Sequence, residues 1–82
     1  MDRIMTIDRM EHVIDVFGSF DQNLRIIESE LHVTVTDRED SLKISGEDEE
    51  AVMHAEKAIE GLLSLAARGE RIEEQNVRYI LK

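Results

Sequence analysis

The sequence predicts an α+β domain in which helices cover one face of a small antiparallel sheet. Residues 32–36 and 41–45 alternate apolar with polar side chains, which is typical of strands with one buried face. Other segments repeat apolar residues every three or four positions, which is typical of amphipathic helices. The predicted order is β-α-α-β-β-α followed by a short C-terminal helix. That order places the helices against one face of a three-stranded sheet.

The N-terminal part predicts a strand at residues 3–7 and a helix at residues 8–17. The segment RIMTI is short and apolar, as expected of an edge strand. Asp8 is the expected N-cap of the helix. The inner face of this helix is expected to carry Met10, Val13, Ile14 and Phe17. Gly18 follows at the position where a left-handed conformation favours glycine.

A second helix is predicted at residues 21–31, with Leu24, Ile27 and Leu31 on its inner face. Its start has two interpretations. Ser19 and Gln22 have the spacing of a capping box, whereas Asp21 could be the N-cap instead.

The two strands at 32–36 and 41–45 are expected to form a hairpin, because the polar connector 37–40 is short. Their alternation assigns one set of side chains to the core and the other to solvent. The expected core set is Val33, Val35, Leu42 and Ile44, and the solvent set is Thr34, Thr36, Lys43 and Ser45. Gly46 ends the second of these strands.

The longest predicted helix covers residues 47–68 and begins with four carboxylates, where the helix dipole favours negative charge. Its inner face is expected to carry Val52, Ala55, Ile59, Leu62, Leu63 and Ala66. Gly69 ends it. A last helix is predicted at 73–81. Its apolar residues either pack on the long helix or form a docking surface for another domain, and the sequence leaves both possibilities open.

Length and composition fit one domain, residues 1–82, with no cysteine and an aliphatic core. No apolar run reaches the ~20 residues of a membrane span. The N-terminus lacks the basic start and apolar run of a signal peptide. We therefore expect a cytoplasmic, soluble domain without a membrane partner.

The net charge of −9 limits the possible partners. Lys and Arg contacts to phosphate supply most non-specific affinity for nucleic acid. A chain with 10 basic and 19 acidic residues lacks that attraction overall, so any nucleic-acid binding must be local.

No catalytic centre or cofactor site is predicted. Carboxylates are abundant, but none is marked by a positioned His, Ser or Lys for acid–base or nucleophilic chemistry. The three histidines show no metal-ligand spacing, and residues 47–50 lack the pattern of a calcium loop. The P-loop motif G-x-x-x-x-G-K-[ST] is absent. We expect a non-enzymatic chain.

Several residues resemble the motif of a type I KH domain, I-G-x-x-G-x-x-I-x-x-I followed by a strand. Gly18 takes the first glycine, and the later apolar positions are Leu24, Ile27, Val33 and Val35. Asp21 replaces the second glycine. His32 replaces the glycine after the second helix, and His tolerates a left-handed conformation better than most residues.

The sequence is also similar to the N-terminal domain of PhoH-like proteins, which are bacterial ATPases. The similarity extends from about residue 13 to residue 80 and rests on four short runs. These are Phe17-Gly18 with Asp21, Asn23 and Leu24; Ile44-Ser45-Gly46 with Ala51-Val52; Ala66 with Arg68-Gly69-Glu70; and Val77-Arg78-Tyr79. The resemblance implies a KH-like domain beside a separate domain that binds ATP and Mg²⁺. It also allows an oligomer formed through the whole protein.

The KH resemblance implies weak binding of single-stranded RNA at the loop 18–21, whose backbone amides would approach phosphate. The expected nucleic-acid-binding residues are Gly18, Ser19, Phe20, Asp21, Asn23, Arg25 and Lys43. The carboxylate of Asp21 opposes a phosphate, and so does the acidic hairpin loop 37–40 that would form the facing rim.

Other interpretations of this loop stay open. Ser19 and Asp21 could be helix caps only. Phe20 could stack on a base, but an aromatic residue between two helices more often packs under the turn, and we favour that placement. The alternative function is a degenerate KH module that has lost nucleic-acid binding and serves protein docking or oligomer assembly.

Overall fold

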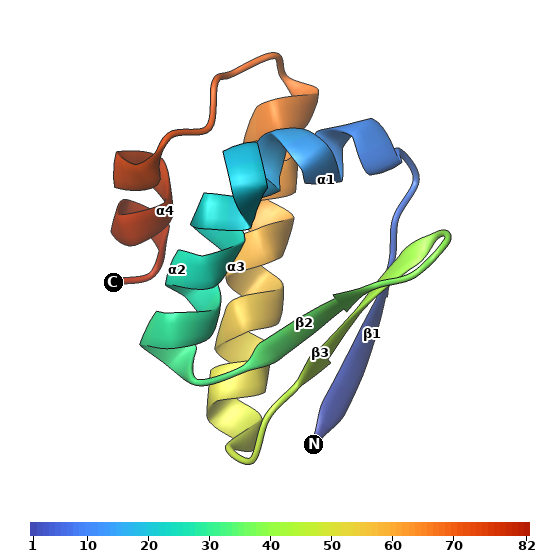
Figure 1. Ribbon diagram of the computed structural model, residues 1–82, viewed down its shortest axis with the longest axis vertical. Helices are drawn as coiled ribbons and strands as arrows, with labels where there is room; N and C mark the ends of the chain where they lie inside the picture. Colours follow the sequence, from blue (N-terminus) through green and yellow to red (C-terminus); the bar gives the residue numbers. More distant parts are fainter.

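The computed structural model describes residues 1–82 and has a sheet on one side and helices on the other (Figure 1). The predicted α+β class is confirmed, and the arrangement is compatible with a KH-like fold. The strands are β1 (Asp2–Thr6), β2 (Thr34–Asp37) and β3 (Ser41–Ser45). The helices are α1 (Met10–Phe17), α2 (Gln22–Leu31), α3 (Glu49–Ala67) and α4 (Glu74–Ile80), with a 3₁₀ turn at Ser19–Asp21.

The sheet is antiparallel throughout, with β3 between β1 and β2. In the β1–β3 pair, Met5 lies opposite Leu42, and in the β2–β3 pair Val35 lies opposite Ile44. The predicted core set of the hairpin is buried, as the alternation indicated. The prediction that the first strand lies at an edge is also confirmed.

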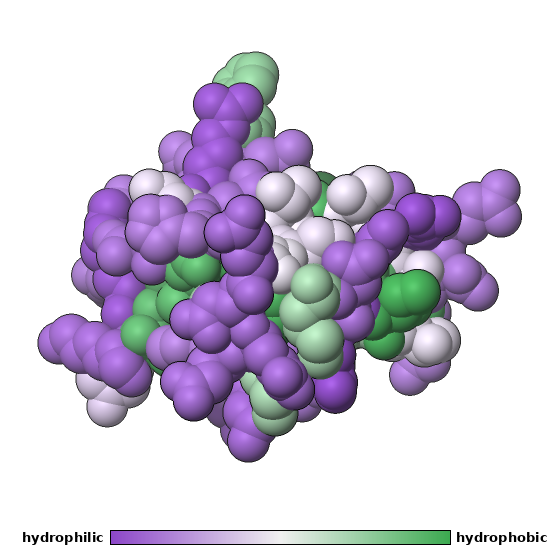
Figure 2. All heavy atoms as spheres, turned by 90° about the horizontal axis from the view of Figure 1, so that it is seen from below, coloured by the Kyte–Doolittle hydropathy of each residue, from purple (hydrophilic) through white to green (hydrophobic).

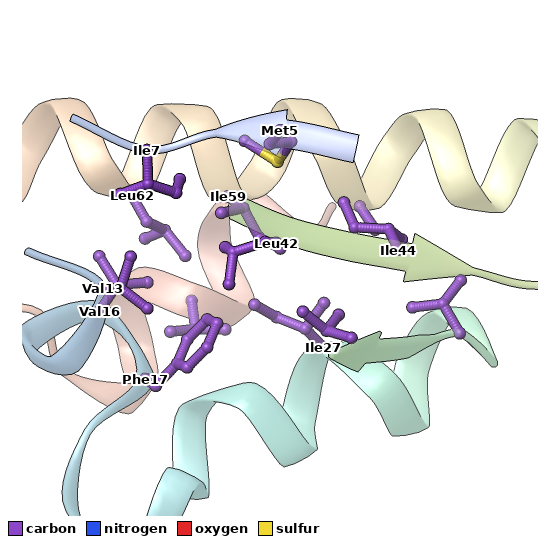
Figure 3. Close-up of a cluster of buried hydrophobic side chains, with 14 of the residues drawn as sticks. Met5, Ile7, Val13, Val16, Phe17, Ile27, Leu42, Ile44, Ile59 and Leu62 are labelled. Atoms are coloured by element: carbon purple, nitrogen blue, oxygen red, sulfur yellow. The ribbon is translucent and has the colours of Figure 1, made fainter. Parts of the chain in front are cut away.

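The core lies between the sheet and the helix layer. Figure 3 shows Leu42 and Ile44 of β3 meeting side chains from three helices: Val13, Val16, Phe17, Ile27, Ile59 and Leu62. Leu42, Ile44, Ile59 and Leu62 have no exposed surface (0%). Burying each such side chain contributes about 1.5–3 kcal/mol, so this aliphatic cluster compensates for the shortage of aromatic residues.

Helix α1 begins two residues later than predicted. Arg9, in an extended conformation, is the N-cap residue, and no side chain caps this end, so the expectation for Asp8 is wrong. The buried positions are Val13, Val16 and Phe17. Ile14 is 70% exposed, contrary to its predicted place on the inner face. Its position is about 100° around the helix from Val13, which turns it away from the sheet.

The junctions around α2 also differ from prediction. The helix begins at Gln22, and no side-chain cap is made by Asp21 or by the capping box that Ser19 suggested. His32 is left-handed (φ 54°, ψ 48°), as expected. The N–H of Val33 bonds to the carbonyl of Glu28, 3.2 Å away, which delays the start of β2 to Thr34.

Helix α3 begins at Glu49, capped by Asp48, whose Oδ1 accepts the N–H of Glu50 at 3.0 Å. The predicted inner face is buried apart from Leu63, which is half-buried, and Ala58 joins it. Gly69 has the positive φ expected of it (84°).

Most apolar residues of the C-terminal segment pack against the rest of the domain, which answers the question of whether they form a docking surface instead. Val77 is fully buried, and Ile80 and Leu81 pack against the core. Ile80 lies so close to Gly61 that a Cβ there would stand 2.5 Å from Ile80 Cδ1. Tyr79 remains 77% exposed. Seen from below, the molecular surface is mainly hydrophilic, and its apolar patches are small and separate (Figure 2).

Candidate nucleic-acid interface

The turn between α1 and α2 has an unusual backbone. Gly18 has φ 77° and ψ −178°, a combination that is essentially restricted to glycine. A side chain at this position would also lie 3.0 Å from Nδ2 of Asn23. Phe20 and Asp21 follow with φ of 54° and 56°. Two consecutive non-glycine residues with positive φ are rare, and each costs on the order of 1 kcal/mol or more.

Asn23 is a structural residue of this turn. It is only 1% exposed, and its Nδ2 donates to the carbonyl of Val16 at 3.0 Å. Val16 lies in the last turn of α1, where carbonyls lack partners within the helix. Asn23 Oδ1 has no hydrogen-bond partner within the protein. The structure thus places this predicted binding residue beneath the turn, where it joins α2 to α1.

Phe20 is 94% exposed at the tip of the turn, so the favoured placement of its ring in the core is wrong. Its backbone has a positive φ (54°). Ser19, Asp21 and Arg25 are also exposed. Together with Phe20, these residues form what we call the turn surface: Ser19, Phe20, Asp21 and Arg25.

Lys43 lies on the sheet, whereas the turn surface belongs to the helix layer. It alternates along β3 with the buried Leu42 and Ile44, so it lies on the sheet face that no helix covers. Its Nζ lies 3.5 Å from Oδ2 of Asp2 on the neighbouring strand. The structure therefore does not bring this predicted site residue together with the others.

The hairpin loop 37–40 is exposed and acidic, as the sequence suggested. In Figure 1 the tip of the hairpin projects beside the start of α1, whereas the α1–α2 turn lies at the other end of that helix. The loop therefore does not form a rim directly facing the turn surface.

A residue that the sequence analysis missed lies between α2 and β2. Glu28 Oε2 accepts the N–H of Val35 at 2.9 Å. The same residue's carbonyl accepts the N–H of Val33. A signal for this contact was present, because Glu28 occupies the apolar stripe formed by Leu24, Ile27 and Leu31. A carboxylate at such a position needs a hydrogen-bond partner when it is partly buried.

Ion pairs within the chain occupy most of its cations. The paired residues are Arg3, Arg9, Lys43, Arg68, Arg71 and Arg78. The pKa of Arg78 is raised by its hydrogen bond to Glu74 first and by the charges of Glu74 and Glu30. Arg25 forms no ion pair and adjoins the turn, so it is the cation of this region that is free for a phosphate.

No cluster of three or more His, Cys, Asp or Glu side chains has an arrangement that could hold a metal ion. None of the helices combines the length and apolarity needed to cross a membrane.

The chain is similar over 72 residues to a PhoH-like protein of Bacillus subtilis (strain 168), with 29% identity. This similarity covers 88% of the chain but only 22% of the relative's length. No protein-family model matches the chain, and no solved structure matches it. The chain thus spans about a fifth of the length of the curated relative that it matches.

Proposed function

We propose that this chain is the non-catalytic, KH-like domain of a cytoplasmic PhoH-like protein and that it adds weak contacts to single-stranded RNA. The similarity to a PhoH-like protein and the KH-like order of elements support the assignment. ATP and Mg²⁺ would bind in a separate domain outside these 82 residues. A P-loop motif is accordingly expected elsewhere in the same polypeptide, and its absence there would contradict the assignment.

The exposed ring of Phe20 is the observation that carries the RNA proposal. An aromatic ring that is 94% exposed on a conformationally restricted turn offers a face on which a base can stack. Arg25 follows one turn later along α2 and can contact the adjacent phosphate. Stacking contributes about 1–3 kcal/mol per base, so a single ring and a single cation give weak binding.

The rest of the structure supports contacts at the turn surface alone. Asn23 is buried, Lys43 lies on the uncovered face of the sheet beside Asp2, and Glu28 already accepts the N–H of Val35. RNA would therefore touch the tip of the turn rather than lie along α2 and β2.

The test is an NMR titration with a short, blocked single-stranded RNA at ~0.02 M and then at ~0.2 M salt. Shifts confined to residues 18–25 are expected, and affinity should fall about fivefold over this range for one phosphate contact. Phe20→Ala should abolish the shifts, whereas Phe20→Tyr should retain them. Asp21→Asn should strengthen binding, because it removes a carboxylate beside the phosphate while keeping a residue that tolerates positive φ.

Lys43→Gln is the matched control, because it removes one positive charge far from the turn. Equal weakening by Lys43→Gln and Arg25→Gln would indicate a general charge effect and contradict the proposed site. Absence of shifts even at low salt would contradict RNA binding by this domain.

A second candidate function is protein docking or oligomer assembly through the same turn. The acidity of the chain favours it, since the net charge of −9 opposes nucleic acid but not a protein partner. If Phe20→Ala leaves RNA titrations unchanged but abolishes an interaction with the remainder of the PhoH-like protein, docking is the function of this turn.

A further inference from the structure

The free edge of β1 presents unpaired backbone groups. Met1 and Gly46 exchange hydrogen bonds at 2.9 and 3.1 Å, and the N–H of Ile7 bonds to Asp40 at 2.8 Å. In an antiparallel ladder, bonding direction alternates from residue to residue. The odd-numbered residues of β1 therefore bond to β3. The N–H and C=O groups of Asp2, Ile4 and Thr6 point away from the sheet and find no partner in the protein.

The charged side chains of β1 do not block this edge. Arg3 is held over the helix side by Glu56, with Nη2 2.8 Å from Oε1. Asp2 is held on the open face by Lys43. Edge strands are commonly protected by projecting charges, prolines or bulges. This strand has no proline, and its five pairings with β3 run without a break.

A hollow of about 520 Å³ runs between this edge and α3. Its walls include Met5 and Ile7 from the strand and Glu60 and Leu63 from the helix. A second hollow of about 370 Å³ shares Thr6, Ile7, Leu63 and Ser64 with it and continues toward the start of α1. From Ile4 onward, the backbone edge therefore borders two hollows with a partly apolar lining.

We propose that the β1 edge binds an extended segment of a partner protein as a fourth strand, and that this segment is basic. The unpaired donors and acceptors of β1 supply the main-chain recognition of such a strand. Alternate side chains of the added strand face the helix side, where Leu63 offers an apolar contact and Glu60 a carboxylate. Glu60 takes part in no ion pair within the chain.

Charge selects a basic partner over a second copy of this chain. Each copy carries a net charge of −9, and a dimer formed through this edge would bring two Glu60 carboxylates to the same interface, where they repel each other. A segment with Lys or Arg at alternate positions is complementary to Glu60 and to the overall field of the domain. This site shares no residue with the turn surface and does not depend on the RNA proposal.

The probe is a blocked peptide, Lys-Thr-Val-Thr-Lys-Thr-Val-Thr, in which one face of the strand carries both Lys and Val, and it is titrated into the ¹⁵N-labelled chain. Shifts are expected in residues 2–6 and at Glu60 and Leu63, and not in residues 34–37. A peptide with Glu in place of Lys should bind more weakly. Two further peptides carry N-methyl groups on the odd or the even residues. Only one of them should lose binding, because only one set of amides can face β1.

Two variants of the chain complete the test. Ile4→Pro removes an outward N–H without breaking the β1–β3 ladder and should abolish peptide binding. Glu60→Lys lies on the helix surface and should weaken binding of the basic peptide about two- to fivefold while strengthening the acidic one. The proposal is overturned if Glu60→Lys leaves the preference unchanged or if no shifts occur at millimolar peptide. It is also overturned if sedimentation shows a dimer that Ile4→Pro dissociates, because a second copy would then occupy the edge.

Discussion

The two edges of the sheet differ in how their outward backbone groups are satisfied. At the β2 edge, the N–H groups of Val33, just before the strand, and of Val35 both bond to Glu28, one to its carbonyl and one to its carboxylate. On β1, the corresponding groups of Asp2, Ile4 and Thr6 have no partner in the protein. Glu28 thus satisfies two outward N–H groups at the β2 edge, whereas no group of the chain satisfies those of β1.

The difference between the two edges indicates which of them is available for association with a partner. Unpaired edges promote association, so proteins usually cover both of them. Here Glu28 of α2 occupies two backbone N–H groups at the β2 edge. The open edge is the one beside α3, where a hollow and an unpaired carboxylate lie.

Amide hydrogen exchange should show the largest contrast. We expect the amide protons of Val33 and Val35 to exchange at least a hundredfold more slowly, relative to unstructured peptides, than those of Ile4 and Thr6. The reason is that an outward amide on β1 is bonded to water only. NMR-detected exchange measures all four in one sample. Similar protection at Ile4 and Val35 would show that the β1 edge is covered after all.

Proline substitution along β1 tests the assignment of inward and outward amides. Met5→Pro removes an amide that faces Leu42 and should lower the free energy of unfolding by about 3 kcal/mol or more, whereas Ile4→Pro should cost about 1 kcal/mol or less. Denaturant unfolding measures both. Because Met5 is buried, Met5→Ala serves as the control for the lost side chain, and the proline variant should be clearly less stable than the alanine variant.

Removing the hydrogen bond between Glu28 and Val35 should have an intermediate effect on the free energy of unfolding. Glu28→Ala leaves the N–H of Val35 without its partner and should lower the free energy of unfolding by about 1–2 kcal/mol. Glu28→Gln keeps an acceptor at the same place and should cost less. A stability that is the same in both variants would show that the contact between Glu28 and Val35 does not hold this edge. Faster exchange at Val35 in the alanine variant is the accompanying local readout.

The sequence predicted the elements well because hydrophobic periodicity is a local signal. The inner residues of α3 and of the hairpin follow from spacing alone, and burial confirms them, apart from Leu63. Gly18 and His32 were also recognised, since positive φ restricts residue type. Local spacing could not place Ile14, because the phase of a short helix depends on where it begins.

The candidate site was predicted less well because it depends on contacts between elements. No local pattern shows that Asn23 turns inward to the carbonyl of Val16 or that Lys43 is held by Asp2 across two strands. Phe20 was expected in the core because aromatic residues are usually buried. Its backbone conformation, which sequence does not reveal when the residue is not glycine, reverses that expectation.

The smallest predicted effect concerns the pKa of Asp2, the β1 residue whose side chain lies beside Lys43 on the open face of the sheet. The pKa of Asp2 lies below its ordinary value of 3.8, first because the hydroxyl of Ser45 donates to its carboxylate and then because Lys43 is near. A lowered carboxyl pKa stabilises the fold above the unfolded-state pKa, and this contribution is lost as pH falls through the folded-state pKa. Because Asp2 is exposed, the change in stability should be small.

NMR titration of the Asp2 carboxyl group measures this pKa directly. Ser45→Ala should raise it more than Lys43→Met does, because the hydrogen bond is the larger cause. Added salt should reduce the effect of Lys43 but not that of Ser45, since screening acts on separated charges more than on a hydrogen bond. A larger shift from Lys43→Met than from Ser45→Ala would mean that the charge of Lys43, rather than the hydrogen bond, is the larger cause of the lowered pKa.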